Sequence, residues 1–301
     1  MYIKEPVAII VLNYNKKKDI LDCLESIFKM DYKEFEVIVV DNGSSDSSVN
    51  DIRARYPDIH IIESKKNLGV AGGRNLGIDF ANANLKYKFL LFLDDDIIIE
   101  KSALSELINP FNTNEKIGIV TPKCYLTKIP GAIGYAGGMS VNLFTGRIAD
   151  IGHGEMDKGQ YDEPGFIQSC AGLCLVKREL INEIGIFDEN FNPYGWEDVD
   201  LSLRAGKNGF RIFYNPKAVI YHKGGKIGRG KAVEMYEFSK SKNYFYLIKK
   251  HANFLQLITI SLSFPFRILP LIFKELVNSD IKTISAQIRG VISLFKNQTS
   301  D

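Results

Sequence analysis

The sequence is poor in cysteine, tryptophan and histidine, with four, one and four of them among 301 residues. The cysteines are too few and too irregularly spaced for a disulfide framework: Cys23, Cys124, Cys170 and Cys174. Cys170 and Cys174 lie in the apolar run CAGLCLV without a second Cys or His pair, which favours small buried residues over a zinc site. We therefore expect a reducing compartment and a cytoplasmic location.

The sequence also lacks an apolar run of the length that a signal peptide or a membrane span needs. The first run, from Pro6 to Leu12, stops at Asn13, and three lysines follow soon after, unlike a secretory signal. The uncharged residues from Phe254 to Phe266 would extend about 20 Å as a helix, whereas the hydrocarbon core is about 30 Å thick. We expect neither a signal peptide nor a membrane-spanning helix.

Charge is distributed unevenly, although the formal net charge is only +2. Residues 217–301 contain 14 Lys and Arg against 5 Asp and Glu. These basic residues are interleaved with apolar stretches, which disfavours a nucleic-acid partner and favours peripheral contact with the anionic inner face of a membrane. The alternative is that the apolar residues pack on the rest of the chain or in a homodimer interface.

Apolar runs bounded by polar turns recur in the first hundred residues, at 7–12, 35–40, 60–62 and 88–93. Between the first two runs, the apolar residues from Lys17 to Phe28 recur at helical spacing. Near-continuous apolar strands separated by helices are typical of a parallel sheet that is covered on both faces. The fold class predicted is α/β, with a mostly parallel, Rossmann-like sheet flanked by helices.

Later segments give a weaker pattern. Residues 112–170 are rich in glycine and turn formers and predict short strands and loops. A strand is expected near 171–176, a helix from Arg178, and a helical C-terminal extension over about 232–273.

Polar residues follow three of the early apolar runs, at the point where each predicted strand ends. They are Asn13-Tyr14-Asn15, Asp41-Asn42-Gly43-Ser44 and Asp94-Asp95-Asp96. Ligands of open α/β sheets bind beyond the carboxyl ends of the strands, so we expect these ends to meet in one cleft. Adjacent carboxylates repel one another unless a cation compensates them, which indicates a site for a hard divalent metal. An acidic turn or helix cap is the alternative.

The segment KNLGVAGGRNLG combines Gly69, Gly72 and Gly73 with Arg74. Glycines allow the backbone to approach a ligand, and a helix that begins here would direct amide groups toward phosphate. The spacing of the glycines matches neither the dinucleotide-binding fingerprint nor the Walker A motif, which argues against a dehydrogenase and against a P-loop nucleotide-binding protein. Alone, the segment is also consistent with a glycine-rich loop that caps a helix.

The segment YGWEDVD places Glu197 and Asp198 beside the only tryptophan, Trp196. A second carboxylate and an indole raise the proton affinity of a carboxylate, which suits a general base. Acidic residues are also common in the first turn of a helix, and Trp196 is either a platform for an acceptor sugar or part of the core. We find no Ser, His and Asp in a recognisable catalytic motif, which argues against a hydrolase that works through a covalent intermediate.

The motifs VAIIVLNYN, VVDNGSSD, KNLGVAGGRNLG, FLDDD and GWEDVD occur in an order and spacing that resemble glycosyltransferase family 2, from Val7 to about His222. The resemblance implies a GT-A fold, inverting chemistry, a nucleoside-diphosphate-sugar donor and Mn²⁺ or Mg²⁺. It also implies a catalytic domain over residues 1–225, with nucleotide-sugar binding in about 1–111 and acceptor binding and catalysis in 112–225. Residues 226–301 would form the basic, apolar helical extension.

The resemblance also implies roles for single residues. Asp198 would be the catalytic base and Glu197 its orienting neighbour. Asp41 would accept a hydrogen bond from the nucleobase imide. The expected metal ligands are Asp94, Asp96 and His222, and Trp196 is expected at the acceptor. The remaining expected donor-binding residues are Asn13, Asn15, Asn67, Gly72, Arg74, Asp94 and Asp95.

The sequence therefore predicts a glycosyltransferase that moves one sugar per encounter to a glycan or lipid-linked glycan. NLGVAGGRN resembles a segment of rhamnosyltransferase-like members, which puts dTDP-rhamnose narrowly ahead of UDP-hexoses as the donor. A processive synthase is disfavoured because the sequence has no Q-x-x-R-W motif. A non-catalytic nucleotide-sugar or glycan-binding homologue and a nucleotidyltransferase remain the alternatives.

Overall fold

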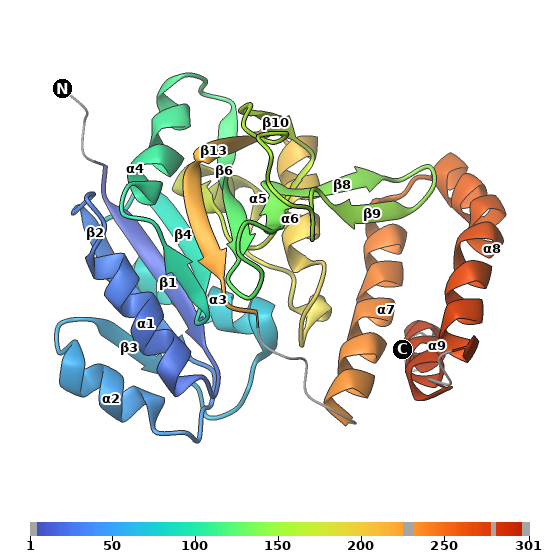
Figure 1. The fold of residues 1–301 in the computed structure, drawn as a ribbon, viewed down its shortest axis with the longest axis horizontal. Helices are drawn as coiled ribbons and strands as arrows, with labels where there is room; N and C mark the ends of the chain where they lie inside the picture. Colours follow the sequence, from blue (N-terminus) through green and yellow to red (C-terminus); the bar gives the residue numbers. More distant parts are fainter. Residues whose placement is uncertain (1–4, 225–230, 278–280, 297–301) are drawn as a thin grey trace.

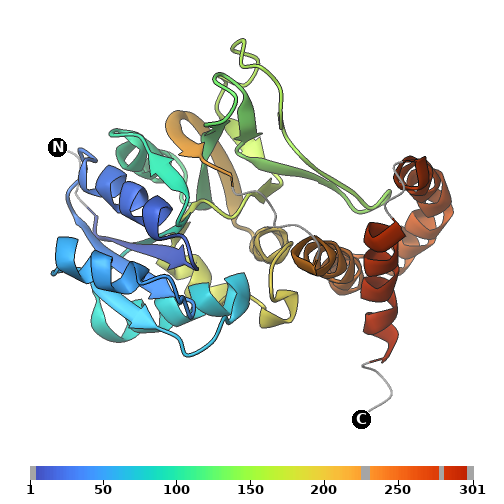
Figure 2. The same cartoon turned by 60° about the horizontal axis from the view of Figure 1, so that its bottom comes forward.

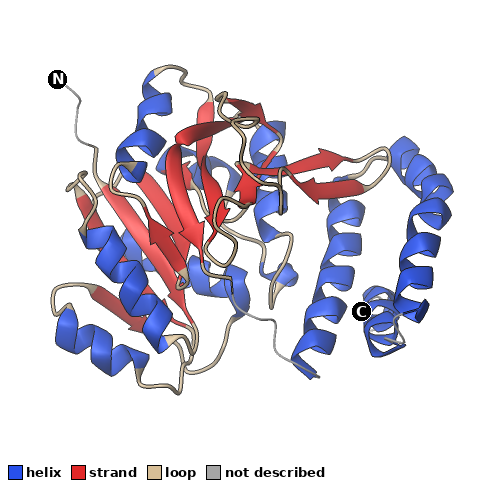
Figure 3. Cartoon of the chain, viewed as in Figure 1, coloured by secondary structure: helices blue, strands red, loops and turns tan. Residues whose placement is uncertain are grey.

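The computed structural model describes residues 5–224, 231–277 and 281–296. An α/β body occupies one side of the molecule, and three C-terminal helices stand beside it (Figure 1). The strands lie at the centre of the body with helices outside them (Figure 3). The main sheet has the order β10-β13-β6-β12-β4-β1-β2-β3, with β5 paired to β13 and β7 paired to β6.

Four strands form the parallel part of this sheet. They are β1 (Val7–Asn13), β2 (Phe35–Asp41), β3 (His60–Glu63) and β4 (Phe89–Asp94). The pairs β1–β2, β1–β4 and β2–β3 are all parallel, as predicted. In register, Asn13 lies opposite Asp41, and Leu12 lies opposite Asp94. The polar strand ends therefore meet at one edge of the sheet, as expected.

Helices cover both faces of the parallel strands. They are α1 (Lys17–Phe28), α2 (Ser48–Arg55) and α3 (Gly69–Asn84), and α1 has the bounds that its periodicity predicts. Alternate residues of β1 enter two separate cores, Val11 with α1 and Ile10 with α3. Helix α3 lies so close to β1 that a Cβ atom on Gly73 would be 2.4 Å from Leu12 Cδ1. Gly73 thus has a packing role that fixes α3 against the sheet.

The second half of the body mixes strand directions. Its strands are β5 (Ile97–Ile99), β6 (Ile117–Leu126), β7 (Ile133–Ala136), β8 (Gly138–Asn142), β9 (Arg147–Asp150), β10 (Gly165–Ile167), β11 (Ser169–Cys170), β12 (Leu175–Lys177) and β13 (Arg211–His222). Strand β12 runs antiparallel to both β4 and β6, and β6 runs parallel to β13. A separate small sheet has the order β11-β8-β9.

Two expectations about this half are wrong in detail. Only short strands were expected in this region, but strand β6 has 10 residues. Its length was missed because Thr121, Pro122 and Lys123 interrupt the apolar pattern of the strand. The strand expected near 171–176 begins only at Leu175. Gly172, with a φ of 69°, turns the chain before it. Sequence hydrophobicity does not distinguish this buried turn from a buried strand.

The remaining helices of the body are α4 (Ala103–Ile108), α5 (Arg178–Ile184) and α6 (Glu197–Lys207), with 3₁₀ turns η1 (Asn109–Asn112) and η2 (Glu189–Phe191). The C-terminal group contains α7 (Lys231–His251), α8 (Phe254–Val277) and α9 (Ile281–Lys296), in agreement with the predicted helical extension. Helix α7 lies between the body and the other two helices (Figure 2). The domain boundary expected at 225/226 lies outside the described residues.

None of the helices in the described part of the chain is both long and apolar enough to cross a membrane.

Candidate active site

The three aspartates at the end of β4 point to different partners. Asp94 accepts a hydrogen bond from Arg74 Nη2 at 3.1 Å and is the most exposed of the three, with 41% of its side chain accessible. Asp95 is buried and accepts the backbone N–H of Tyr14 at 3.0 Å. Asp96 is buried and faces His222, whose Nε2 lies 3.2 Å from Asp96 Oδ1. The carboxylate of Asp94 therefore pairs apart from those of Asp95 and Asp96.

Lys16 compensates the charge of this acidic run. Its Nζ lies 3.1 Å from Asp95 Oδ1 and 2.8 Å from Asp96 Oδ2. Burial raises the pKa of Asp95 to about 7 despite the attraction of Lys16. Burial acts the same way on Asp96, but hydrogen bonds from His222 and Lys16 outweigh it and hold its pKa well below the usual range. Sequence reasoning missed Lys16, and the only signal for it was the lysine run after Asn15.

A divalent metal fits this site in part. Asp96 offers a carboxylate, which suits both Mn²⁺ and Mg²⁺, and His222 beside it offers an imidazole, which suits a transition metal such as Mn²⁺ rather than Mg²⁺. The third expected ligand, Asp94, is instead paired with Arg74. Within residues 5–224, 231–277 and 281–296, no three His, Cys, Asp or Glu side chains are arranged to hold a metal ion. The metal roles of Asp94, Asp96 and His222 remain predictions.

The expected nucleobase contact, Asp41, lies at the end of β2 and is almost fully buried. Its Oδ1 accepts a hydrogen bond from Asn13 Nδ2 at 2.8 Å, and its Oδ2 accepts one from Ser44 N at 3.0 Å. Asn15 Oδ1 accepts the N–H of Ser45 at 2.8 Å from across the same turn. Asp41 is thereby fixed in orientation, and each carboxylate oxygen retains a second lone pair for a ligand.

The glycine-rich segment begins a helix where it was predicted. Asn67 Oδ1 accepts the N–H of Gly69 at 2.8 Å, which holds the turn before α3. The first amides of the helix bond to residues 192–193: Val70 N donates to Pro193 O at 2.8 Å, and Gly72 N lies 3.5 Å from Asn192 Oδ1. These amides are bonded within the protein, and a phosphate contact of Gly72 stays a prediction.

The expected catalytic pair begins helix α6 and is buried, with 6% of Glu197 and 8% of Asp198 accessible. Glu197 Oε2 accepts the N–H of Gly195, and Asp198 Oδ1 accepts that of Val199, each at 2.8 Å. Burial and the neighbouring charge of Glu197 raise the pKa of Asp198 well above its usual range. Burial also raises the pKa of Glu197, although Arg74 opposes this. Both groups hold protons more tightly than ordinary carboxylates.

Arg74 connects the two acidic runs. Its Nη2 lies 3.1 Å from Asp94, and its Nη1 lies 3.5 Å from Glu197. Only 3% of its side chain is accessible, and the guanidinium stacks near the rings of Phe92 and Phe187. The sequence predicted Arg74 as a donor-binding residue but gave no sign that it bridges Asp94 and Glu197.

Asp200 and Trp196 face helix α7. Asp200 is fully buried and accepts hydrogen bonds from Arg204 Nε and His251 Nε2, both at 2.8 Å, with Lys250 Nζ at 2.7 Å. It is thus unavailable to an acceptor.

Trp196 donates its indole N–H to Lys240 O at 2.9 Å and packs with Phe191, Val199 and Leu247. Trp196 is half-buried, so part of its ring stays accessible. Contact of that part with an acceptor sugar stays a prediction.

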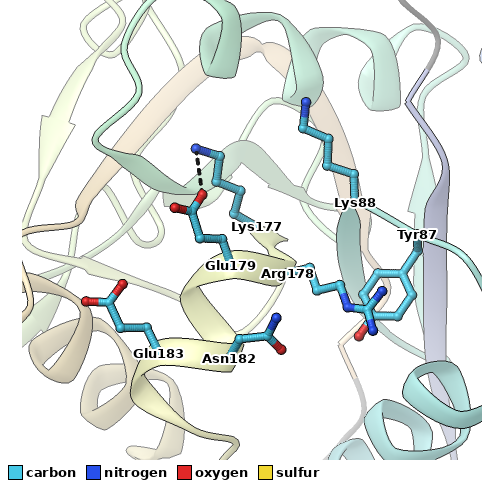
Figure 4. Close-up of a pocket in the computed structure, with 7 residues that line it drawn as sticks. All are labelled: Tyr87, Lys88, Lys177, Arg178, Glu179, Asn182 and Glu183. Atoms are coloured by element: carbon cyan, nitrogen blue, oxygen red, sulfur yellow. Dashed lines mark ion pairs between the residues drawn. The ribbon is translucent and has the colours of Figure 1, made fainter.

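A cavity of about 480 Å³ lies elsewhere, next to the first residues of β4 (Figure 4). Its lining residues are Tyr87, Lys88, Lys177, Arg178, Glu179, Asn182 and Glu183. None of them belongs to the predicted site, which lies at the other end of β4. Lys88 pairs with Glu5 and Lys177 with Glu179, so these two cations are already neutralised by the chain itself.

Comparisons with known proteins agree with this architecture. Among solved structures, GalNAc-T7 with UDP, GalNAc and Mn²⁺ has a TM-score of 0.63 and 15% identity, covering 81% of this chain and 48% of that one. Residues 1–349 of S. aureus TarS have a TM-score of 0.56 and 19% identity, covering 86% of this chain and 70% of that one. These likenesses confirm the predicted GT-A type fold.

A curated relative, the poly-β-1,6-N-acetyl-D-glucosamine synthase of Staphylococcus epidermidis, is 24% identical over 221 residues, which is 72% of this chain and 50% of the synthase. The chain thus spans about half the length of the curated relatives that it matches. The family model "Glycosyl transferase family 2" matches residues 8–174 and ends before Glu197, Asp198 and His222. Since that match covers more than half of the 301 residues, the chain belongs to glycosyl transferase family 2.

Proposed function

We propose that the chain transfers a sugar from a nucleoside-diphosphate sugar to a hydroxyl group of a glycan or lipid-linked glycan, with inversion at the anomeric carbon. One observation carries this proposal. Arg74 contacts both Asp94, at the end of β4, and Glu197, beside Asp198. A group expected at the donor and the neighbour of the base expected at the acceptor are therefore linked through one buried arginine, which supports the close approach of two substrates that a single displacement requires.

Asp198 would act as the base. Its carboxylate takes the proton of the acceptor hydroxyl, whose oxygen forms a bond to the anomeric carbon while the bond from that carbon to the diphosphate oxygen breaks. The raised pKa of Asp198 increases its affinity for this proton. Glu197 supports the raised pKa through its charge, and Arg74 holds Glu197 in place.

The donor site would comprise Asp41 at the nucleobase and the β4 aspartates at the diphosphate. A divalent ion, Mn²⁺ or Mg²⁺, would stabilise the charge of the leaving diphosphate when bound. Asp96 and His222, with Asp94, are the residues that would hold it. The similar proteins include GalNAc-T7 with UDP and GalNAc and a poly-β-1,6-N-acetyl-D-glucosamine synthase, so UDP-N-acetylhexosamines join dTDP-rhamnose and UDP-hexoses as candidate donors.

The decisive experiment incubates the protein with a panel of these nucleotide sugars, a divalent metal and candidate glycan acceptors. We expect free nucleoside diphosphate and a glycosylated acceptor from one donor. Formation of a nucleoside triphosphate and a sugar 1-phosphate when pyrophosphate is added would instead indicate a nucleotidyltransferase. Binding of a donor without turnover across the panel would indicate a non-catalytic homologue.

We also propose that α8 contacts an anionic membrane surface and so brings the site to a lipid-linked acceptor. Helix α8 lies on the outer side of the molecule, beyond α7 (Figure 1). It exposes a row of apolar side chains: Phe254 (79%), Leu255 (59%), Ile258 (42%), Leu262 (69%) and Phe266 (81%). Interfacial helices combine such a row with basic residues, each of which adds about 1 kcal/mol of attraction to anionic lipid.

Liposome flotation tests this contact. The protein should float with vesicles that contain anionic lipid, and Leu262→Glu should weaken flotation. Ile129→Glu is the matched control, because Ile129 is similarly exposed at 53% but lies outside α8. A protein that stays unbound at low salt, with α8 protected from proteolysis, would contradict membrane contact and favour a homodimer interface.

A further inference from the structure

The segment that leads into the catalytic pair has an unfavourable backbone conformation. Gly195 has a φ of 97°, and Trp196, which follows it, has a φ of 74°. Positive φ is costly for a bulky residue such as tryptophan and persists only where the surroundings hold it. Helix α6 starts at the next residue, Glu197, so whatever holds Trp196 also sets the position of Glu197 and Asp198.

Asn243 of helix α7 holds this segment directly. The side chain is fully buried, and its amide N–H groups point to three backbone carbonyls. They donate to Phe191 O, to Tyr194 O at 3.0 Å and to Gly195 O at 3.3 Å. The two N–H groups of this side chain, at least one of them shared, thus bond three carbonyl groups between the end of η2 and the start of α6.

Other residues of α7 fix the same segment on both sides of the catalytic pair. Before the pair, Trp196 donates its indole N–H to Lys240 O at 2.9 Å. After it, Asp200 contacts Lys250 and His251 at 2.7 and 2.8 Å. Of the α7 residues that make these contacts, Asn243 lies three positions after Lys240 and seven positions before Lys250, about one and two helical turns, which places these three on one face of the helix. His251 follows Lys250 directly.

We propose that Asn243 is a positioning residue for the catalytic pair and that α7 is thereby part of the active site. The proposal rests on the proposed function of Asp198 as the base. Asn243 contacts neither Glu197 nor Asp198 through its side chain and acts on them through the backbone of residues 191–196. Because small displacements of a catalytic group reduce turnover strongly, this support would govern the rate more than substrate affinity.

The test uses the only tryptophan, Trp196, as a reporter of the segment. Asn243→Asp keeps the size of the side chain but places a carboxylate against three carbonyls. We expect its tryptophan emission to shift to longer wavelength and acrylamide quenching to increase. In an active preparation, kcat should fall about 10²-fold while KM for the donor stays unchanged. Asn182→Asp is the control, because Asn182 is exposed on α5.

If Asn243→Asp does not fold, Asn243→Ser serves instead, because its hydroxyl can still donate to one carbonyl, and we expect intermediate effects. Wild-type emission and quenching in a folded variant would overturn the proposal, as would an unchanged kcat. The fluorescence measurement needs no donor. If the wild-type protein transfers no sugar, the proposed function fails, while the emission still decides whether Asn243 holds the segment.

Discussion

The acidic runs Asp94–Asp96 and Glu197–Asp200 each contain three carboxylates but bind protons differently. In the first run, Lys16 and His222 contact Asp96 and lower its pKa. In the second run, Glu197 and Asp198 are buried with Arg74 as their cation, and both have raised pKa values. The comparison indicates that burial and the nearest cations, rather than the density of acidic residues, set the pKa of each carboxylate.

Each run also contains a buried carboxylate that several groups of the protein bind. Asp95 is bonded to Lys16 and to the N–H of Tyr14. Asp200 is bonded to Arg204, Lys250 and His251. Both carboxylates are buried and bonded within the protein, so they support the framework, and the donor-binding role expected of Asp95 stays a prediction. The residues beside them are those that we propose to meet substrates. The following predictions test this division, beginning with the largest expected effect.

Replacement of the base should have the largest effect. Asp198→Asn should lower kcat by about 10²–10⁴-fold, because an amide cannot take the acceptor proton. Donor affinity, measured by calorimetry, should stay near that of the wild type. If the variant keeps most of its kcat, Glu197 becomes the better candidate for the base, since Asp200 is enclosed by its three partners.

Removal of a metal ligand should act on binding instead. Asp96→Ala should abolish metal-dependent binding of UDP or dTDP. Replacement of a residue that only supports a metal ligand lowers metal affinity by roughly 10–100-fold, and we expect loss of a ligand itself to have a larger effect. Calorimetric titration with and without Mn²⁺ measures this, and circular dichroism checks the fold. Asp58→Ala is the control, because Asp58 is exposed. Undiminished binding that still requires metal would refute the assignment of Asp96.

Replacement of the framework carboxylate in the second run should reduce stability. Burial opposes ionisation of Asp200, but hydrogen bonds from His251 and Lys250 lower its pKa to about 2. A lowered pKa stabilises the folded state above the unfolded pKa of about 4, and this stabilisation disappears as the pH falls toward 2. Asp200→Asn should therefore cost about 2 kcal/mol at pH 7 and little near pH 2.

Urea unfolding at both pH values measures this difference, with Asp58→Asn as the matched control. An equal loss of stability at pH 7 and near pH 2 would mean that the ionic contacts of Asp200 contribute nothing.

The smallest effect concerns the pH dependence of turnover. Because Asp198 must be ionised to accept a proton, kcat should rise with pH, with a midpoint above the ordinary Asp value of about 4. Glu197→Gln removes the neighbouring charge that raises the pKa of Asp198, so the midpoint should move to lower pH. A midpoint that stays in place in this variant would show that Glu197 does not influence the base.

Local patterns predicted much of the fold. The bounds of α1 and the parallel pairing of β1, β2 and β4 follow from apolar periodicity, which neighbouring residues determine. The acidic strand end at Asp94 follows from the apolar run before it, and the start of α3 was expected from the glycine-rich segment KNLGVAGGRNLG.

The polar partners of the site could not be predicted in this way. Lys16 lies about 80 residues from Asp96, and Asn243 lies about 50 residues from Phe191 and Gly195. Such pairs depend on how elements pack in three dimensions, and a single lysine or asparagine leaves no periodic signal. The same limit applies to Arg74, whose residue type was noted while its bridge between Asp94 and Glu197 was not.

The four cysteines are all free and buried, and they lie in three parts of the body. Cys23 belongs to α1, Cys124 to β6, and Cys170 and Cys174 flank the turn at Gly172 beside Asp198. A thiol reagent can reach them only when the surrounding structure opens. The rate at which each thiol is labelled would therefore report how often the region around it opens in solution. The measurement needs no engineered probe.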